Sequence, residues 1–387
     1  MMECLHALVS GEVHGNGASH AGSHLKRQKV QGLVRLGLGL AFVPSLLLGC
    51  GGGGSAESPA ASAPQAPAAS TANVLFKSNF GPGVSLGAPY NFSTHGAYQD
   101  LTGTDSETGY TWPVTALGAN FSGVQLIAPV AITPSTIGNY TRAELRTVSG
   151  PTGSRESELF LNTVDNGGVG NSRSAQTDFL IGRPWNRGDV TNLYTTFWVK
   201  FPANLATTLD PDVSSGNWQA LTEFKTGGAT HPVTGLRYGG GDYRIKVIIL
   251  KNNAGELYWL TKADDAANWV IVNSFGAVVE CPGSPECPSL QTYWRVENHD
   301  IPVPVGTWAK VEVYWHRSSG ADGRYWAAVN GQVIADYHGS TMGDLGLPIT
   351  RIFSTLAYSG GLPPNETHTR GLEFWDGFPC GVGRSCY

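Results

Sequence analysis

The chain has 387 residues, with 51 Gly, 23 Pro and 11 Trp, but only 14% of its residues are charged and its formal net charge is −5. Many turn formers and aromatics with few charged runs favour an all-β protein, and the length suits one large sandwich with a tail. The acidic balance argues against nucleic acid as a partner, because a phosphate backbone binds a basic face.

Residues 1–49 read as a leader. Lys26 and Arg27 precede an apolar run over 36–48 that is too short to span a bilayer comfortably, which is the pattern of an export signal. The string Leu47-Leu48-Gly49-Cys50 resembles the lipobox of bacterial lipoproteins. That resemblance implies lipidation of Cys50 and an exported protein that faces the periplasm or the cell surface and meets the membrane only through its lipid. The alternative is a plain hydrophobic helix with a chance cysteine.

Residues 50–72 are rich in Gly, Ala, Ser and Pro and are expected to form a flexible tether, so that 73–387 is the single folded domain. Its four cysteines come as two pairs with equal spacing, Cys281 with Cys287 and Cys380 with Cys386. In an exported protein an even count predicts disulfides, and we favour the two local ones among three connectivities. A four-cysteine zinc site is the alternative, although these spacings exceed the usual two to four residues.

Short β-runs separated by turn signals fill the domain, which is the pattern of a sandwich of two antiparallel sheets. Asn330-Gly331 is the strongest hairpin signal in the chain. The predicted strands are 74–80, 124–132, 141–146, 158–164, 193–201, 217–225, 243–250, 256–261, 269–275, 308–317, 324–330, 332–337, 349–358 and 371–378.

The strand Thr141-Arg142-Ala143-Glu144-Leu145-Arg146 alternates strictly, so Arg142, Glu144 and Arg146 share one face. Charged groups in a row cannot lie in a dry core without partners. Two guanidinium groups around a carboxylate could seat an anionic ligand, since each presents a planar fork that matches a carboxylate. The alternative is a solvated strand face.

Arg142-Ala143-Glu144-Leu145-Arg146 is similar to the Arg-x-Glu-Leu-Arg strand of jelly-roll polysaccharide lyases, which include alginate and glucuronan lyases. The segments around Trp218 and Trp308 follow in a compatible order. The resemblance implies a concanavalin A-like β-jelly-roll and cleavage of an acidic, uronate-containing polysaccharide by β-elimination. Glu223 and Lys225 stand where alginate lyases carry a Gln-x-His pair, so a polymer other than alginate is indicated.

β-Elimination needs a group that neutralises the uronate carboxylate and a base that removes the C5 proton. Arg142 and Arg146 suit the first role, with Glu144 orienting them or binding a sugar hydroxyl. Tyr358 and Tyr243 are the tyrosine candidates for the base. His231, in a Gly/Pro-rich loop, is the histidine candidate, and each of the three could equally be a structural aromatic or a solvated loop residue.

A second polar face is predicted on the strand 243–250, where Arg244 and Lys246 alternate with Ile and Val. If that face joins the one bearing Arg142 and Glu223, it forms a basic floor that attracts a polyanion. The alternative is a solvated edge guarded by lysine. Trp198, Trp218 and Trp259 could stack on sugar rings, although most tryptophans in a sandwich are core.

The sequence calls for no cofactor and no catalytic metal. A structural Ca²⁺ could support a loop near Asp376, and the protein is expected to act as a monomer. Two other functions remain open on the same fold. A glycoside hydrolase of the laminarinase type would need Glu-x-Asp-x-x-Glu on one strand, which is absent from the sequence. A non-catalytic, lectin-like or laminin-G-like module would need a binding platform but no base.

Overall fold

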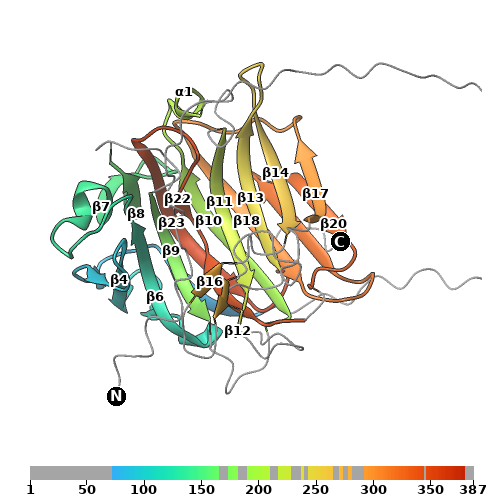
Figure 1. Ribbon diagram of the computed structural model, residues 1–387, viewed down its shortest axis with the longest axis horizontal. Helices are drawn as coiled ribbons and strands as arrows, with labels where there is room; N and C mark the ends of the chain where they lie inside the picture. The colour runs from blue at the N-terminus through green and yellow to red at the C-terminus, as the bar shows by residue number, and fades with distance from the viewer. Residues whose placement is uncertain are drawn as a thin grey trace, which may run out of the picture. The chain divides into compact units, whose positions relative to one another are not determined.

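The structure is a computed structural model that describes residues 72–164, 173–181, 190–209, 217–227, 237–238, 243–264, 270–272, 278–280, 292–343 and 346–379. Two antiparallel sheets pack face to face as a β-sandwich of the jelly-roll type, which confirms the predicted fold class (Figure 1). The described helical segments are single turns: α1 (Leu205–Thr208), η2 (Thr115–Leu117) and η3 (Ile137–Asn139). No helix in these ranges has the length and hydrophobicity to cross a membrane.

The first sheet has eight strands, and the predicted meander around Asn330-Gly331 forms one end of it. Asn330 and Gly331 have φ values of 51° and 78°, the left-handed pair that a tight hairpin requires. In spatial order the strands are β20 (Gln332–His338), β19 (Arg324–Val329), β18 (Trp308–His316), β10 (Asn192–Lys200), β23 (Asn365–Trp375), β8 (Arg155–Thr163) and β7 (Thr141–Ser149), with β1 (Val74–Ser78) also on β23.

The second sheet has twelve strands, and β11 lies near its middle (Figure 1). The main path is β17 (Thr292–Asn298), β14 (Leu257–Asp264), β13 (Arg244–Lys251), β11 (Trp218–Thr226), β21 (Ile349–Phe353), β9 (Ser174–Ile181), β6 (Ala119–Ile127), β4 (Gly96–Thr104) and β2 (Val84–Leu86). The short strands β3 (Tyr90–Asn91) and β5 (Thr111–Trp112) pair with β4, and β22 (Leu356–Ala357) pairs with β9. The strands β12 (Arg237–Tyr238), β15 (Val270–Val272) and β16 (Val278–Glu280) form a small separate sheet.

The core lies between the two large sheets and is built from the apolar half of each alternating strand. Phe179 on β9 meets Phe374 on β23 with ring centroids 5.1 Å apart, and Phe224 on β11 meets Trp315 on β18 at 5.7 Å. Because strand side chains alternate, every residue one step away from these rings points out of the sandwich. The outer faces of the two sheets are therefore where polar chemistry can be placed.

Candidate functional site

Charged side chains cover the middle of the twelve-stranded sheet on the face turned away from the core. Ile245, Val247 and Ile249 of β13 are buried in the core, so the residues that alternate with them face outward. The strands pair in a register that brings these outward residues together in two rows. This charged strip consists of Glu223, Lys225, Arg244, Lys246, Lys262 and Asp264.

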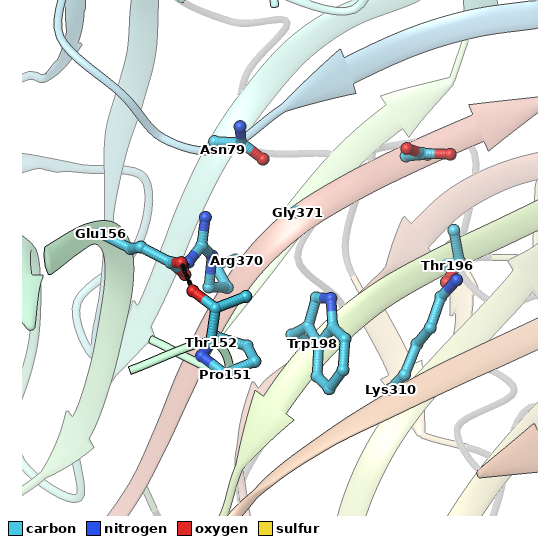
Figure 2. A pocket seen from close by; sticks show the side chains of 10 residues that line it. Asn79, Pro151, Thr152, Glu156, Thr196, Trp198, Lys310, Arg370 and Gly371 are labelled. Carbon is cyan, nitrogen blue, oxygen red and sulfur yellow. Dashed lines mark hydrogen bonds and ion pairs between the residues drawn. The ribbon is translucent and has the colours of Figure 1, made fainter. Parts of the chain in front are cut away.

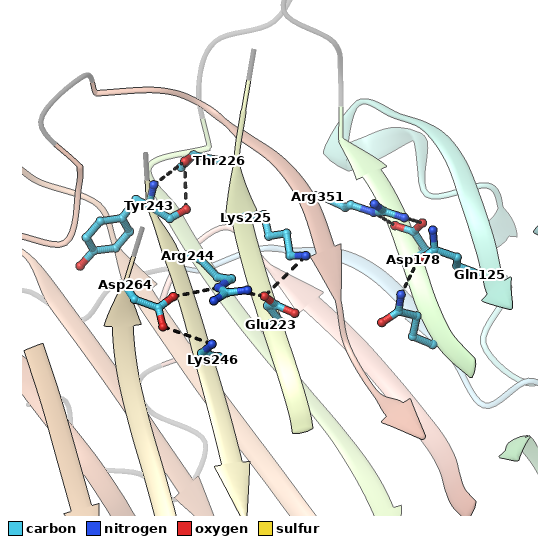
Figure 3. Close-up of polar contacts among 11 residues, drawn as sticks. Gln125, Asp178, Glu223, Lys225, Thr226, Tyr243, Arg244, Lys246, Asp264 and Arg351 are labelled. Carbon is cyan, nitrogen blue, oxygen red and sulfur yellow. Dashed lines mark hydrogen bonds and ion pairs between the residues drawn. The ribbon is translucent and has the colours of Figure 1, made fainter. Parts of the chain in front are cut away.

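Every member of the charged strip is ion-paired within it, and Figure 3 shows these contacts for all members except Lys262. Arg244 Nε lies 2.8 Å from Asp264 Oδ1 and 3.3 Å from Glu223 Oε1. Asp264 Oδ2 also meets Lys246 Nζ at 3.1 Å and Lys262 Nζ at 2.8 Å. Glu223 Oε1 is buried and, among the described residues, accepts no hydrogen bond, although Lys225 Nζ lies 3.6 Å away. The carboxylates thus hold four cations in fixed positions.

The pKa values of the strip reflect burial opposed by opposite charge. Burial would raise the pKa of Asp264, but Arg244 and Lys246 lower it to about 2. Burial would also raise the pKa of Glu223, but Lys225 and Arg244 lower it below its usual value. Burial and the nearby charge of Arg244 lower the pKa of Lys246 to about 8. The charge of Lys246 therefore changes at a pH of about 8.

Beside the strip, β21 and β9 contribute a buried ion pair. Arg351 Nε donates to Asp178 Oδ1 at 2.7 Å, and its Nη2 donates to Asp178 Oδ2 in the same forked arrangement. The Tyr98 hydroxyl also accepts a hydrogen bond from this guanidinium, at 3.3 Å. Further along the face, Gln176 donates to Gln125 (Figure 3 shows Asp178, Arg351 and Gln125). The strip and the Arg351–Asp178 pair together contain five cations and three carboxylates, a net charge of plus two for these eight residues.

An aromatic cluster borders the strip. Trp218 and Tyr358 pack edge to face with ring centroids 4.8 Å apart, and both side chains are partly exposed. They pack on the buried Phe353, whose ring lies 5.1 Å from Lys225 Nζ and 4.5 Å from the Arg351 guanidinium. Aromatic faces thus lie next to fixed cations, which is a surface that fits a chain of acidic sugar rings.

The Arg142 strand lies elsewhere. It is β7, the edge strand of the eight-stranded sheet, whereas Glu223 and Arg244 belong to the twelve-stranded sheet. The prediction that these residues share one floor is wrong, because strand alternation fixes a face but not the sheet. Glu144 bridges both arginines, at 3.5 Å from Arg142 Nε and 2.7 Å from Arg146 Nη2, and Arg146 also covers the Phe160 ring. Both guanidinium groups are partnered at an exposed edge.

Tyr243 and Trp259 are core residues, at 0% and 1% exposure. The Tyr243 hydroxyl accepts a hydrogen bond from Trp294 Nε1 at 2.7 Å, so it does not reach the outer face of the sheet. Asp376, the residue considered for Ca²⁺, accepts hydrogen bonds from the Asn73 backbone and side chain. The histidine candidate for the base, His231, lies outside the described residues, as do the predicted lipid site Cys50 and the predicted disulfide cysteines Cys281, Cys287, Cys380 and Cys386.

Four charged residues of the strip and of the neighbouring ion pair were not predicted from the sequence: Lys262, Asp264, Asp178 and Arg351. The first two lie beyond the predicted end of the 256–261 strand, since β14 continues to Asp264. Asp178 belongs to β9, a strand that was not predicted at all. The alternation of Gln176, Asp178 and Leu180 with Ala175, Thr177 and Phe179 could have revealed it.

No family model and no curated protein matches the sequence. Among solved structures, the chain is similar to the alginate lyase Aly36B, with 16% identity and a TM-score of 0.37 over 76% of this chain and 97% of that chain. An endo-β-1,4-glucuronan lyase from the fungus Trichoderma reesei gives 14% identity and a TM-score of 0.36 over 61% and 90% of the two chains.

A binding domain also matches. That of botulinum neurotoxin serotype D/C gives 8% identity and a TM-score of 0.33 over 67% of this chain and 46% of that chain. Enzymes and binding modules both carry this type of sandwich, so the likenesses do not distinguish catalysis from binding. What the chain does has to be argued from its own side chains.

Proposed function

We propose that the protein is a polysaccharide lyase that cleaves an acidic, uronate-containing polysaccharide by β-elimination on the outer face of the twelve-stranded sheet. The observation that carries the proposal is the charged strip: carboxylate-fixed cations beside Tyr358 and Trp218 in a protein whose net charge is −5. A local excess of positive charge in an acidic protein draws a polyanion to one face.

The first chemical requirement is neutralisation of the uronate carboxylate, because its charge makes the neighbouring C5 proton only weakly acidic. Lys225 and Arg244 are placed to meet that carboxylate, and they are held there by Glu223 before the substrate arrives. Prepositioned cations stabilise the enolate-like charge that develops as the proton leaves, without reorganising first. We therefore assign neutralisation of the carboxylate to Lys225 and Arg244 in place of Arg142 and Arg146, which lie on the eight-stranded sheet.

The second requirement is a base, and Tyr358 is the candidate on this face. Its ring packs on the same aromatic cluster as Phe353, which lies next to Lys225 and Arg351. The base takes the C5 proton, the released electron pair forms the C4–C5 double bond, and the bond from C4 to the glycosidic oxygen breaks. The leaving oxygen then takes a proton, which the same phenol can return.

The assay that tests the proposal follows the absorbance of the unsaturated product with alginate, glucuronan, pectate and glycosaminoglycans as substrates. A lyase produces this chromophore with at least one polymer. A hydrolase would release reducing ends without it, and a binding module would retain a polymer on an affinity gel without either product. Absence of the chromophore from the whole panel, with retention of a polymer, would replace the lyase by the lectin-like alternative.

Binding of the polymer is expected to weaken as the pH rises through about 8. The pKa of Lys246 lies near that value, so the strip loses one positive charge above it and keeps the charge below it. Retention of the preferred polymer on an affinity gel between pH 6.5 and 9.5 measures the effect. The Lys246→Met variant should bind more weakly at low pH and lose the step, whereas a step of unchanged size in that variant would show that another group titrates.

Arg142→Ala is expected to leave the elimination rate within about twofold of the unchanged protein, since surface substitutions away from a site usually change free energies by no more than about 0.5 kcal/mol. Arg142 is nearly half exposed and lies on the sheet that does not carry the strip. Initial rates of chromophore formation check this. A rate reduced 100-fold or more would indicate that the active site includes β7.

The export signal and lipobox-like string remain a proposal from the sequence. A polymer substrate stays outside the cytoplasm, so a lipid-held protein facing the periplasm or the cell surface fits this activity. The mass of the mature N-terminus tests it: diacylglyceryl-modified Cys50 is expected as the first residue, and a chain that still contains residues 1–49 would contradict it.

A further inference from the structure

A pocket of about 230 Å³ lies on the outer face of the eight-stranded sheet (Figure 2). The charged strip lies on the twelve-stranded sheet, so the pocket and the strip are on different sheets. The cavity is smaller than the roughly 300–1,000 Å³ of pockets for drug-sized ligands, so it suits a single ring. Its lining residues are Asn79, Pro151, Thr152, Glu156, Thr196, Trp198, Lys310, Arg370, Gly371 and Glu373.

Trp198 faces the pocket because it alternates with the core residues Phe197 and Val199 on β10, and an irregularity in β23 lies beside it. The register between β10 and β23 shifts between Thr196 and Trp198, where Gly371 and Leu372 on β23 face the single residue Phe197, and Gly371 has a φ of 59°. Such bulges re-aim side chains, and the left-handed conformation favours glycine. A Cβ on Gly371 would lie 3.2 Å from Trp198 Cδ1, so the missing side chain also leaves the edge of the indole uncovered.

The turn between β7 and β8 forms one wall of the pocket. Trp308 Nε1 donates to Ser149 O at 3.0 Å, which ties the end of β7 to β18 across the sheet. Behind this wall Glu156 is fixed by Thr152 Oγ1 and Ser154 Oγ, both at 2.6 Å, and by an ion pair with Arg370. The wall is therefore held in place by hydrogen bonds at both of its ends.

The pocket combines fixed acceptors with unused donors. On its other side, Glu373 accepts from Trp375 Nε1 at 2.9 Å and pairs with Lys77 Nζ at 3.3 Å. Within the described ranges, no hydrogen bond or ion pair engages Lys310 Nζ or Trp198 Nε1. Carboxylates that accept and amines that donate around an aromatic face are what the hydroxyl groups and C–H face of a pyranose ring require.

We propose that this pocket binds a neutral hexose unit of a glycan, at a site separate from the charged strip. Charge decides the class of sugar: two cations, Lys310 and Arg370, are balanced by two carboxylates, Glu156 and Glu373, so the pocket has no excess charge to attract a uronate. The ring stacks on Trp198, and its hydroxyl groups bond to Glu156, Glu373 and Lys310. The two faces of the sandwich thus hold different parts of a mixed matrix of polysaccharides.

The test is titration of the mature chain with neutral hexasaccharides of β-1,4-glucan, β-1,3-glucan, mannan and galactan, followed by calorimetry and tryptophan fluorescence. At least one should bind, and Trp198→Ala should weaken its binding by about tenfold or more, the loss typical when a central aromatic contact is removed. Trp198→Phe should restore part of the affinity. Tyr90→Ala, which removes an exposed ring from the edge of the other sheet, should change nothing.

Circular dichroism and thermal unfolding identify variants that fail to fold, and Trp198→Phe then takes the place of Trp198→Ala. The proposal is overturned if no neutral hexasaccharide binds, or if the folded Trp198 variants bind it as tightly as the unchanged protein does. It is also overturned if these variants bind an acidic oligosaccharide more weakly but the neutral one equally well. Lys225→Ala distinguishes the two faces, because it should lower lyase activity and leave hexose binding unchanged. Failure of the lyase assay alone would not affect the hexose site.

Discussion

Tyr358→Phe is expected to lower kcat for elimination by about 10²–10⁴-fold, the usual contribution of a positioned proton-transfer group. The substitution removes only the hydroxyl group, which is the proposed acceptor of the C5 proton. The ring stays packed on Trp218, with its contact at 4.8 Å, so KM should change little. Initial rates of chromophore formation on the preferred polymer, measured over a range of substrate concentrations, separate kcat from KM.

Tyr243→Phe is the matched control, since it removes a hydroxyl from a tyrosine that the sequence predicted as an equal candidate. Tyr243 is fully buried and accepts a hydrogen bond from Trp294 Nε1. Its loss should destabilise the fold by roughly 1–3 kcal/mol, because a buried donor is left without its partner, while the folded variant keeps its rate. Equal rates for Tyr358→Phe and the unchanged protein would place the base elsewhere.

The fold class and the outward face of individual strands follow from local sequence. Ile245, Val247 and Ile249 alternate with Arg244 and Lys246, and the structure buries the first set and turns the second outward, as predicted. Period-2 alternation is a property of one strand and needs no knowledge of its neighbours. The Asn330-Gly331 hairpin was predictable for the same reason, since its signal lies within the turn.

Which strands become neighbours was not predictable in this way. Arg142 and Glu223 lie on strands with the same kind of alternation, but jelly-roll connections send β7 and β11 to different sheets. Asp178 pairs with Arg351, which lies 173 residues away in the chain. Contacts at such separations are fixed by topology rather than by local pattern, so the composition of a site spread over several strands requires the structure.

Arg351→Ala is expected to destabilise the fold by about 3–5 kcal/mol, the cost of leaving one member of a buried ion pair uncompensated. The Asp178 side chain is fully buried and that of Arg351 is 13% exposed. Without the forked guanidinium, the fully buried Asp178 carboxylate loses its ion-pair partner. Urea unfolding followed by tryptophan fluorescence gives the difference in free energy, with an unchanged m value as the sign that the unfolded state is the same.

Two further variants decide whether burial of the carboxylate is the cause. Lys225→Ala also removes a cation from this face, but its partner Glu223 keeps Arg244 at 3.3 Å, so the loss should stay below about 1 kcal/mol. The double variant Arg351→Met with Asp178→Leu removes both charges and should recover most of the stability lost by Arg351→Ala, because an apolar pair of similar volume needs no compensation. A double variant as unstable as the single one would instead assign the loss to the packing of Arg351 on the Phe353 ring.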